Sequence, residues 1–255
     1  MTLTSALPFP RLVRKGTMSD HEYLIDQILP RHETSLLAGP SGAGKTRFLL
    51  PAMVKSWEKG LPVLGFKSHP VPWVYVASDR SEESVKRTLE TMSIDPESFP
   101  IIPAWDKAMT IPQILDEVDR LKARFAIIES FGSFCEGRHP TAVKHFLQSY
   151  DRMARTIDLT TLGMMEAPKQ TPSERYENPR QRVSGFASWA HFTETIMLVE
   201  FADPKDVSND ERVFTACPRN YPAFDRLGKF DAHGHLNFPS NVSDPLSDPR
   251  KPSDL

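Results

Sequence analysis

Several features that would place this sequence in a specialised class of protein are missing. Its 255 residues include only two cysteines, and Cys135 and Cys217 lack the spacing of a metal site or of a disulfide framework. No apolar run is long enough to span a bilayer. Prolines and basic residues between Pro8 and Lys15 interrupt the place where a signal peptide would have its apolar core. We therefore expect a cytoplasmic protein that makes no use of a membrane.

A surplus of basic charge is missing as well. The formal net charge is -2 and the isoelectric point is about 6.5. No global positive field therefore attracts nucleic acid, and any site for it must be local. Hydrophobic residues make up 39% and charged residues 25% of the chain, as in ordinary globular proteins. This length and composition suffice for one large α/β domain with a sizeable core.

What the sequence does contain is a glycine-rich loop, Gly39-Pro40-Ser41-Gly42-Ala43-Gly44-Lys45-Thr46. It fits the G-x-x-x-x-G-K-[ST] pattern of the Walker A motif, or P-loop, in which backbone N–H groups curl around a phosphate. Lys45 would reach the β- and γ-phosphates of ATP, and the Thr46 hydroxyl would ligate Mg²⁺. A predicted buried strand over 34–38 and a helix over 46–59 flank the loop, which is the setting that this mechanism requires. The alternative is a coincidental glycine-rich turn.

Strands and helices alternate through the first two thirds of the chain. Apolar runs predict strands over 72–77, 125–128 and 159–165, and helical spacing predicts helices over 20–29, 81–92, 111–123 and 141–156. Such alternation predicts an α/β fold with a mostly parallel central sheet flanked by helices. Further strands are predicted over 193–200, 212–217 and 235–238. Because turn-rich segments separate them, we expect a C-terminal antiparallel extension of the same sheet.

The two ends of the chain differ in composition from the rest. Residues 1–18 hold prolines and basic residues but little that packs, and they predict an extended N-terminal arm. Residues 240–255 contain repeated Asp-Pro steps and almost no apolar side chains. They cannot offset their ordering entropy, so we predict a disordered C-terminal tail. The α/β domain would therefore span residues 19–239.

Two acidic residues follow predicted strands, where an acid can serve a nucleotide site. Glu129 ends the strand over 125–128, and an acid there is what a Walker B site needs to hold the Mg²⁺ shell. A carboxylate buried at that point without a cation would be costly. Asp79 follows the strand over 72–77. The alternative to a catalytic role for Asp79 is that it caps the next helix, with Glu82 completing a capping box.

A resemblance to a known family extends along much of the chain. The segment Tyr23–Pro30, followed by Ser35–Gly39, resembles the stretch that leads into the P-loop of RepA-like hexameric plasmid helicases, which are RecA/DnaB-type ATPases. The similarity continues through the P-loop, through 74–89 and 126–134, and weakly through 182–190. It implies a RecA-like fold and a helicase-like ATPase that works in replication or recombination as a ring or filament of identical subunits. Single-stranded DNA and replication proteins would be its partners, and a plasmid, phage or other mobile element its setting.

The resemblance also assigns roles to individual positions. Lys45 and Thr46 match the family's triphosphate and Mg²⁺ positions without change. Asp79 stands where the family usually has the catalytic Glu that orients the attacking water, and it is one methylene shorter. Glu129 stands where Asp is usual. These two departures put the efficiency of hydrolysis in question.

Two further positions of the family concern coupling between hydrolysis and movement. Met165 and Glu166 stand where the family often carries a polar γ-phosphate sensor. Arg219 stands where related proteins present an arginine finger to the neighbouring subunit. The alternative for Arg219 is a solvated arginine at the end of a strand.

A local basic segment is the candidate nucleic-acid surface. The polar stretch Lys169–Ser184 lacks apolar periodicity and includes Tyr176. Its basic residues are Lys169, Arg175, Arg180 and Arg182. In RecA-type rings the corresponding loop lines the central channel, and here the cations would neutralise phosphates while the tyrosine stacks on a base. The alternative is a solvated mobile loop.

The sequence therefore favours an ATP-hydrolysing oligomeric motor that acts on DNA. A second interpretation keeps the ATP site but makes the protein a slow ATPase that serves as a nucleotide-dependent DNA-binding or helicase-loading module. A third interpretation, a phosphotransferase with a small acceptor, would need a lid of several arginines. The basic cluster Arg175–Arg182 is the candidate for such a lid.

Overall fold

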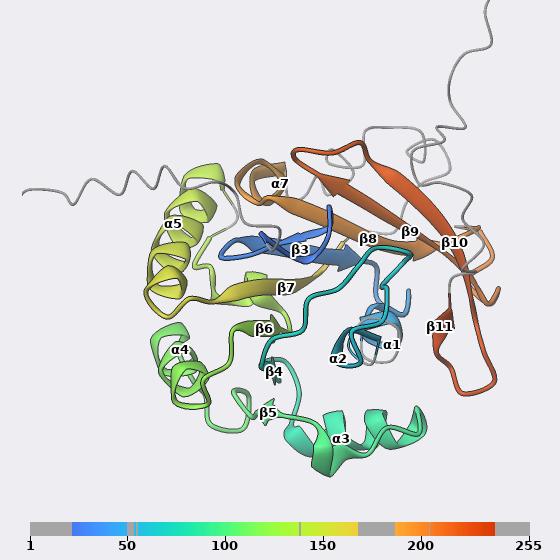
Figure 1. The fold of residues 1–255 in the computed structure, drawn as a ribbon, viewed down its shortest axis with the longest axis horizontal. Helices are drawn as coiled ribbons and strands as arrows, with labels where there is room; N and C mark the ends of the chain where they lie inside the picture. The colour runs from blue at the N-terminus through green and yellow to red at the C-terminus, as the bar shows by residue number, and fades with distance from the viewer. Residues whose placement is uncertain are drawn as a thin grey trace, which may run out of the picture.

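The computed structural model describes residues 22–49, 54, 56–137, 139–167, 187–203 and 205–237. The strands of its main sheet are β3 (Thr34–Gly39), β4 (Trp73–Val76), β5 (Ile101–Ile102), β6 (Phe125–Ile128), β7 (Thr160–Glu166), β8 (Thr195–Phe201), β9 (Glu211–Pro218), β10 (Phe224–Phe230) and β11 (Leu236–Asn237). Within the described residues the sheet has nine strands in the order β11-β10-β9-β8-β3-β7-β6-β4-β5 (Figure 1).

The strands from β8 to β5 in this order are parallel, as predicted. Their residues are mostly apolar, and the apolar side chains alternate between two core clusters, because successive side chains of a strand point to opposite faces. Leu36 and Ala38 of β3 face one cluster and Leu37 faces the other. A sheet buried on both faces explains why these strands appear in the sequence as continuous apolar runs.

Helices cover both faces of this parallel sheet (Figure 1). On one side lie α4 (Ile111–Arg120), α5 (Pro140–Thr156) and α7 (Ala187–Phe192). On the other lie α1 (Lys45–Phe48), α2 (Ser56–Glu58) and α3 (Glu82–Thr91). The described residues also include two short 3-10 helices, η2 (Pro96–Ser98) and η3 (Phe131–Phe134). Among the described residues, no helix combines the length and the apolar character that crossing a bilayer would take.

The C-terminal strands form the predicted antiparallel extension. β9 runs antiparallel to both β8 and β10, and β10 pairs in the same way with β11. The strand β10 itself was not predicted. Its Asp225, Leu227 and Lys229 are exposed, so the segment lacks the continuous apolar run that marks the buried strands.

The helix predicted over 20–29 is wrong for the described part of that segment. Tyr23–Ile25 forms β1, Leu29–Pro30 forms β2, and the two pair as an antiparallel hairpin. Gln27 in the turn has a left-handed φ of 62°, which a helix does not permit. A short run of buried apolar residues fits a folded-back hairpin as well as a helical face, and the spacing alone cannot separate them.

Three predictions fall outside the described residues. They are the arm over 1–18, the tail over 240–255, and the basic segment with Lys169, Arg175, Arg180 and Arg182.

Candidate nucleotide-binding site

The glycine-rich loop connects β3 to α1, as its motif predicts. Gly42 and Gly44 have left-handed φ angles of 78° and 97°, which favour glycine because it has no Cβ. Gly39 must also be glycine, since a Cβ there would lie 2.2 Å from the carbonyl oxygen of Val199 on the neighbouring strand. The N-cap of α1 is Gly44, and no side chain of the described residues caps this first turn. The loop therefore has the backbone shape that a phosphate cradle needs.

Lys45 folds back over this loop. Its Nζ donates to the carbonyl oxygens of Gly39 at 2.7 Å and Pro40 at 3.1 Å. Burial lowers the pKa of the amine, and the carboxylates of Glu166 and Asp79 act in the opposite direction. The ammonium group is thus held next to the loop and close to the acidic residues that face it.

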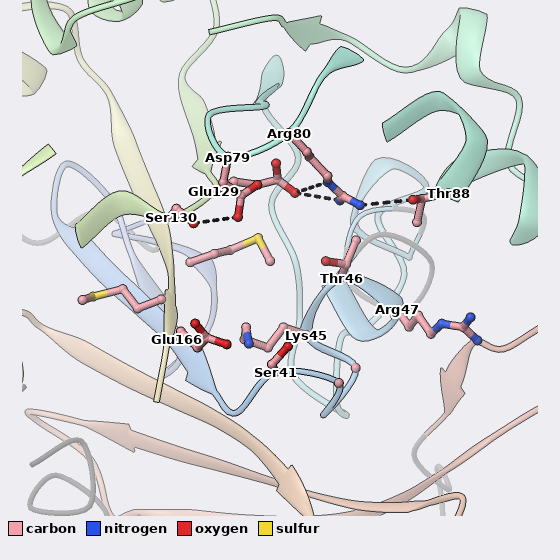
Figure 2. Close-up of a pocket in the computed structure, with 14 residues that line it drawn as sticks. Ser41, Lys45, Thr46, Arg47, Asp79, Arg80, Thr88, Glu129, Ser130 and Glu166 are labelled. Atoms are coloured by element: carbon pink, nitrogen blue, oxygen red, sulfur yellow. Dashed lines mark hydrogen bonds and ion pairs between the residues drawn. The ribbon is translucent and has the colours of Figure 1, made fainter. Parts of the chain in front are cut away.

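A cavity of about 390 Å³ opens between the loop and the ends of three parallel strands (Figure 2). Carboxylates reach it from each of these strand ends: Asp79 after β4, Glu129 after β6 and Glu166 at the end of β7. Thr46 also lines the cavity, next to Lys45 at the start of α1. The cavity is large enough for the polyphosphate of a nucleotide. The parallel sheet therefore brings together residues that are far apart in the sequence.

Glu129 is nearly inaccessible, with 3% of its surface exposed. Its Oε1 accepts hydrogen bonds from the Tyr75 hydroxyl and from Arg80, whose Nε lies at 2.9 Å and Nη2 at 2.6 Å. Burial raises the pKa of Glu129 to about 7; the adjacent Asp79 carboxyl also raises it, whereas Arg80 and the Tyr75 hydroxyl act to lower it. The buried acid that the sequence pointed to is present, and a guanidinium from its own chain partly neutralises it.

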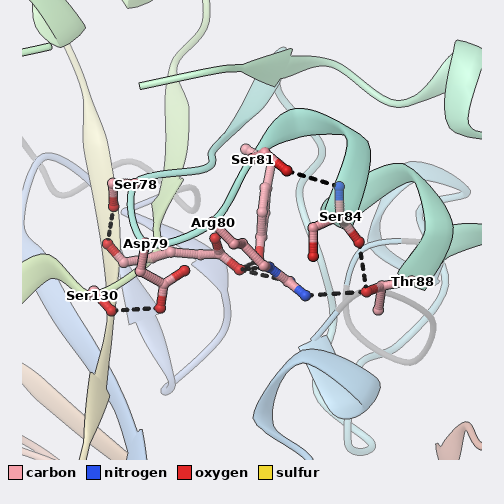
Figure 3. Close-up of polar contacts among 9 residues, drawn as sticks. Ser78, Asp79, Arg80, Ser81, Ser84, Thr88 and Ser130 are labelled. Carbon is pink, nitrogen blue, oxygen red and sulfur yellow. Dashed lines mark hydrogen bonds and ion pairs between the residues drawn. The ribbon is translucent and has the colours of Figure 1, made fainter. Parts of the chain in front are cut away.

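Arg80 is a site residue that sequence reasoning missed. Besides Glu129 it contacts the hydroxyl of Thr88 on α3, at 3.1 Å from Nη1 (Figure 3). The guanidinium therefore links the end of β6 to the helix after β4. The available signal was the acid predicted at a buried strand end, which needs a cation. In the structure Arg80 supplies part of that positive charge, in addition to any Mg²⁺.

Asp79 does not cap the next helix. Its Oδ2 accepts a hydrogen bond of 2.6 Å from the Ser130 hydroxyl, and the N-cap of α3 is Ser81, whose hydroxyl accepts from the backbone N–H of Ser84 at 3.3 Å (Figure 3). The capping alternative is therefore wrong. Asp79 is free of that task and lies on the wall of the cavity.

The residues present fit a divalent cation. Glu129 Oε2 is buried and receives no hydrogen bond from any described residue, and Asp79 lies next to Glu129 on the wall of the same cavity (Figure 2). Two neighbouring carboxylates with an unsatisfied oxygen favour a cation between them. Together with the Thr46 hydroxyl on the cavity wall, Glu129 and Asp79 would hold Mg²⁺ directly or through water. Mg²⁺ bound there would neutralise charge that develops on the phosphate oxygens.

The predicted arginine finger does not join the pocket of its own chain. Arg219 follows β9, whose end pairs with the start of β8, so it lies at the sheet edge opposite the P-loop. Its Nη2 donates to the His191 carbonyl at 2.7 Å and its Nη1 lies 3.2 Å from Glu194 Oε1. The side chain is 45% exposed. A role toward a neighbouring subunit stays a prediction.

A family profile described as an AAA domain, AAA_25, matches residues 7–172. The chain belongs to the AAA_25 family. This match spans the P-loop, both candidate catalytic acids and the strand that carries Glu166. No curated protein matches this AAA_25 protein.

Solved structures resemble the AAA_25 protein in fold. The ATPase domain of G40P has a TM-score of 0.61 at 12% identity, over 81% of this chain and 84% of that one. A KaiC-like protein, PH0186, from the hyperthermophilic archaeon Pyrococcus horikoshii OT3 has a TM-score of 0.54 at 16% identity, over 84% of this chain and 93% of that one. The fold is therefore that of a RecA-like P-loop ATPase, as predicted.

Proposed function

We propose that this protein binds ATP with Mg²⁺ and hydrolyses it as an oligomeric, helicase-like motor on DNA. The observation that carries the proposal is the cavity that joins Lys45 and Thr46 to Asp79 and Glu129 at one edge of the sheet. The fold shared with the ATPase domain of G40P supports a motor of this kind. The resemblance to RepA-like helicases supports replication or recombination of a mobile element as the setting.

Each residue has a defined task in this proposal. Lys45 leaves the loop carbonyls and binds the β- and γ-phosphates. Asp79 orients the attacking water, and Glu129 anchors the cation shell with its free oxygen. Arg219 reaches into the pocket of the neighbouring subunit, where an arginine stabilises transition-state charge.

Two observations favour a slower variant of this function. Glu129 Oε1 is already occupied by Tyr75 and Arg80, so one oxygen remains for the cation shell. Asp79 is shorter than the usual glutamate and is bound by Ser130. The second candidate function is therefore a slow ATPase that loads or binds DNA in a nucleotide-dependent way without unwinding it.

Steady-state ATPase and strand-displacement assays separate these functions. A motor gives turnover that single-stranded DNA stimulates, together with unwinding. A loading module gives nucleotide-dependent DNA binding with little turnover. Phosphate transfer to a small acceptor, without a response to DNA, would contradict both and favour the phosphotransferase interpretation.

We assign DNA contact to the basic segment with Lys169, Arg175, Arg180 and Arg182. Replacing Arg180 and Arg182 by alanine should weaken DNA binding and reduce the slope of its salt dependence by about two. Arg120→Ala removes an arginine that is 66% exposed on α4 and serves as the control. An unaltered slope in the double variant would contradict the assignment.

A further inference from the structure

One buried arginine of the antiparallel extension contacts the P-loop. Arg212, near the start of β9, is 5% exposed. Its Nε donates to the Ala43 carbonyl of the P-loop at 3.0 Å, and its Nη1 donates to the carbonyls of Asn209 and Glu211. The contact joins residues that are 169 positions apart. No sequence pattern predicted this contact between Arg212 and the P-loop.

Two aromatic rings hold this guanidinium in place. Its central carbon lies 4.5 Å from the ring centre of Phe201 on β8 and 4.9 Å from that of Phe230 on β10, within range of cation–π attraction. Phe230 also packs against the loop itself, because a Cβ on Gly44 would lie 2.5 Å from its ring. Three antiparallel strands therefore position one arginine against the phosphate loop.

Among the described residues, Arg212 has no carboxylate partner at contact distance. Its hydrogen bonds go to backbone carbonyls, and within the described ranges it forms no ion pair. Burial lowers its pKa, and the charge of Asp210 opposes this effect. A buried guanidinium without a counterion is costly, and a polyphosphate on the other side of the loop would supply the missing negative charge.

The hydrogen bond to Ala43 also sets the direction of an amide. A trans peptide points its C=O and the following N–H in opposite directions. Because the Ala43 carbonyl is turned toward Arg212, the N–H of Gly44 is turned away from it. Gly44 lines the cavity, and backbone N–H groups of this loop are what bind a phosphate.

We propose that Arg212 is a positioning residue of the nucleotide site, which orients the Gly44 amide and places a buried positive charge beneath the bound phosphates. The inference rests on the proposed nucleotide binding and deepens it. It makes the antiparallel extension part of the site, although that extension lies outside the P-loop motif and outside the matched residues 7–172.

The chain offers a matched control in Arg226 on the adjacent strand β10. Its guanidinium carbon lies 5.0 Å from the ring centre of Phe224, and its Nη1 donates to the carbonyl of Asp225. Burial lowers its pKa as well. Arg226 does not line the cavity. Arg212→Met and Arg226→Met therefore remove the same kind of side chain, but Arg212 alone of the two bonds to the loop.

The test is calorimetric titration of each folded variant with ADP, with a non-hydrolysable ATP analogue and with pyrophosphate, all with Mg²⁺. Arg212→Met should weaken binding of all three by at least about tenfold, because it removes a charged hydrogen bond and a charge near the phosphates. Arg226→Met should stay within about twofold of the wild type. Equal affinities of both variants would overturn the inference while leaving nucleotide binding intact. A wild type that binds no nucleotide would overturn both.

A second variant covers the case in which Arg212→Met fails to fold. Arg212→Lys keeps the charge but loses the planar fork, and it should weaken binding by about threefold. Amide hydrogen exchange of residues 39–46 in its nucleotide-free form should be faster than in the wild type. Unchanged exchange together with unchanged affinity would overturn the inference.

Discussion

The two walls of the nucleotide cavity are built in different ways. The phosphate wall, Gly39–Thr46, is a single stretch of backbone whose shape follows from its glycines. The acidic wall is a set of side chains from the ends of three strands, and within it Tyr75, Arg80 and Glu129 are already bound to one another. The backbone of the phosphate wall thus has the shape that a ligand needs, and only Lys45 has to leave the loop carbonyls, whereas part of the acidic wall is occupied by an internal ion pair.

This difference separates binding from hydrolysis. Binding energy for a nucleotide would come mainly from the phosphate wall, through N–H groups and Lys45. The rate of hydrolysis would depend on Asp79 and Glu129, whose freedom the neighbouring side chains limit. Substitutions on the two walls should therefore give different signatures.

The largest effect is expected on the phosphate wall. Lys45→Ala removes the ammonium that would bind the β- and γ-phosphates, and it should weaken ATP binding by about a hundredfold. Fluorescence titration with an ATP analogue measures this loss. Lys59→Ala removes an exposed lysine that directly follows α2 and should leave the affinity for ATP unchanged. An unchanged affinity of Lys45→Ala for ATP would contradict the claim that nucleotide binding depends mainly on the phosphate wall.

On the acidic wall, Glu129→Gln should act on turnover. It removes the charge that anchors the cation shell, so ATP hydrolysis should fall by about a hundredfold, while binding of ADP weakens by less than about threefold. Single-turnover hydrolysis and titration of the same preparation provide the two numbers. Glu136→Gln, at an exposed position, is the control. A loss of ADP affinity as large as the loss of the ATP hydrolysis rate would contradict the separation of binding from hydrolysis between the two walls.

A smaller effect concerns the ion pair inside the acidic wall. Arg80→Gln leaves the buried Glu129 without its cation and should lower the free energy of unfolding by about 2 kcal/mol. This cost is smaller than the cost of breaking a fully buried ion pair, because the Arg80 side chain is 25% exposed. Arg87→Gln breaks the exposed pair with Glu83 on α3 and should stay within about 0.5 kcal/mol. Urea denaturation measures both, and equal values would contradict the internal neutralisation of Glu129.

The smallest effect on stability is expected at Ser81, and it separates the role of Ser81 from that of Asp79. Ser81→Ala removes the N-cap of α3 and should cost about 1 kcal/mol of stability with little change in ATP turnover. Asp79→Asn should lower ATP turnover with little change in stability, because Asp79 does not cap α3 and lines the cavity. Parallel melting curves and ATPase rates decide this. A stability loss in Asp79→Asn that exceeds the loss in Ser81→Ala would restore the capping role.

Local patterns predicted a large part of this fold. The glycine-rich loop and the buried parallel strands were found because a motif or a continuous apolar run marks each of them. The hairpin at Tyr23–Pro30 and the half-exposed strand β10 were missed, because short or alternating segments carry a weak periodic signal.

The site was predictable only where its residues are consecutive or end a marked strand. Glu129 and Asp79 were found in this way. Arg80 bonds to Glu129 across 49 positions and Arg212 bonds to Ala43 across 169. Such partners are set by the tertiary packing of the sheet, and no local spacing encodes them.

The most direct test of the central claim is an experimental structure of the protein with a non-hydrolysable ATP analogue, Mg²⁺ and single-stranded DNA. We expect the β- and γ-phosphates against Gly39–Thr46, the cation between Thr46 and Glu129, and the nucleotide at a boundary between two copies of the chain. A nucleotide bound elsewhere, or a monomer whose P-loop stays empty at saturating ligand, would contradict the account.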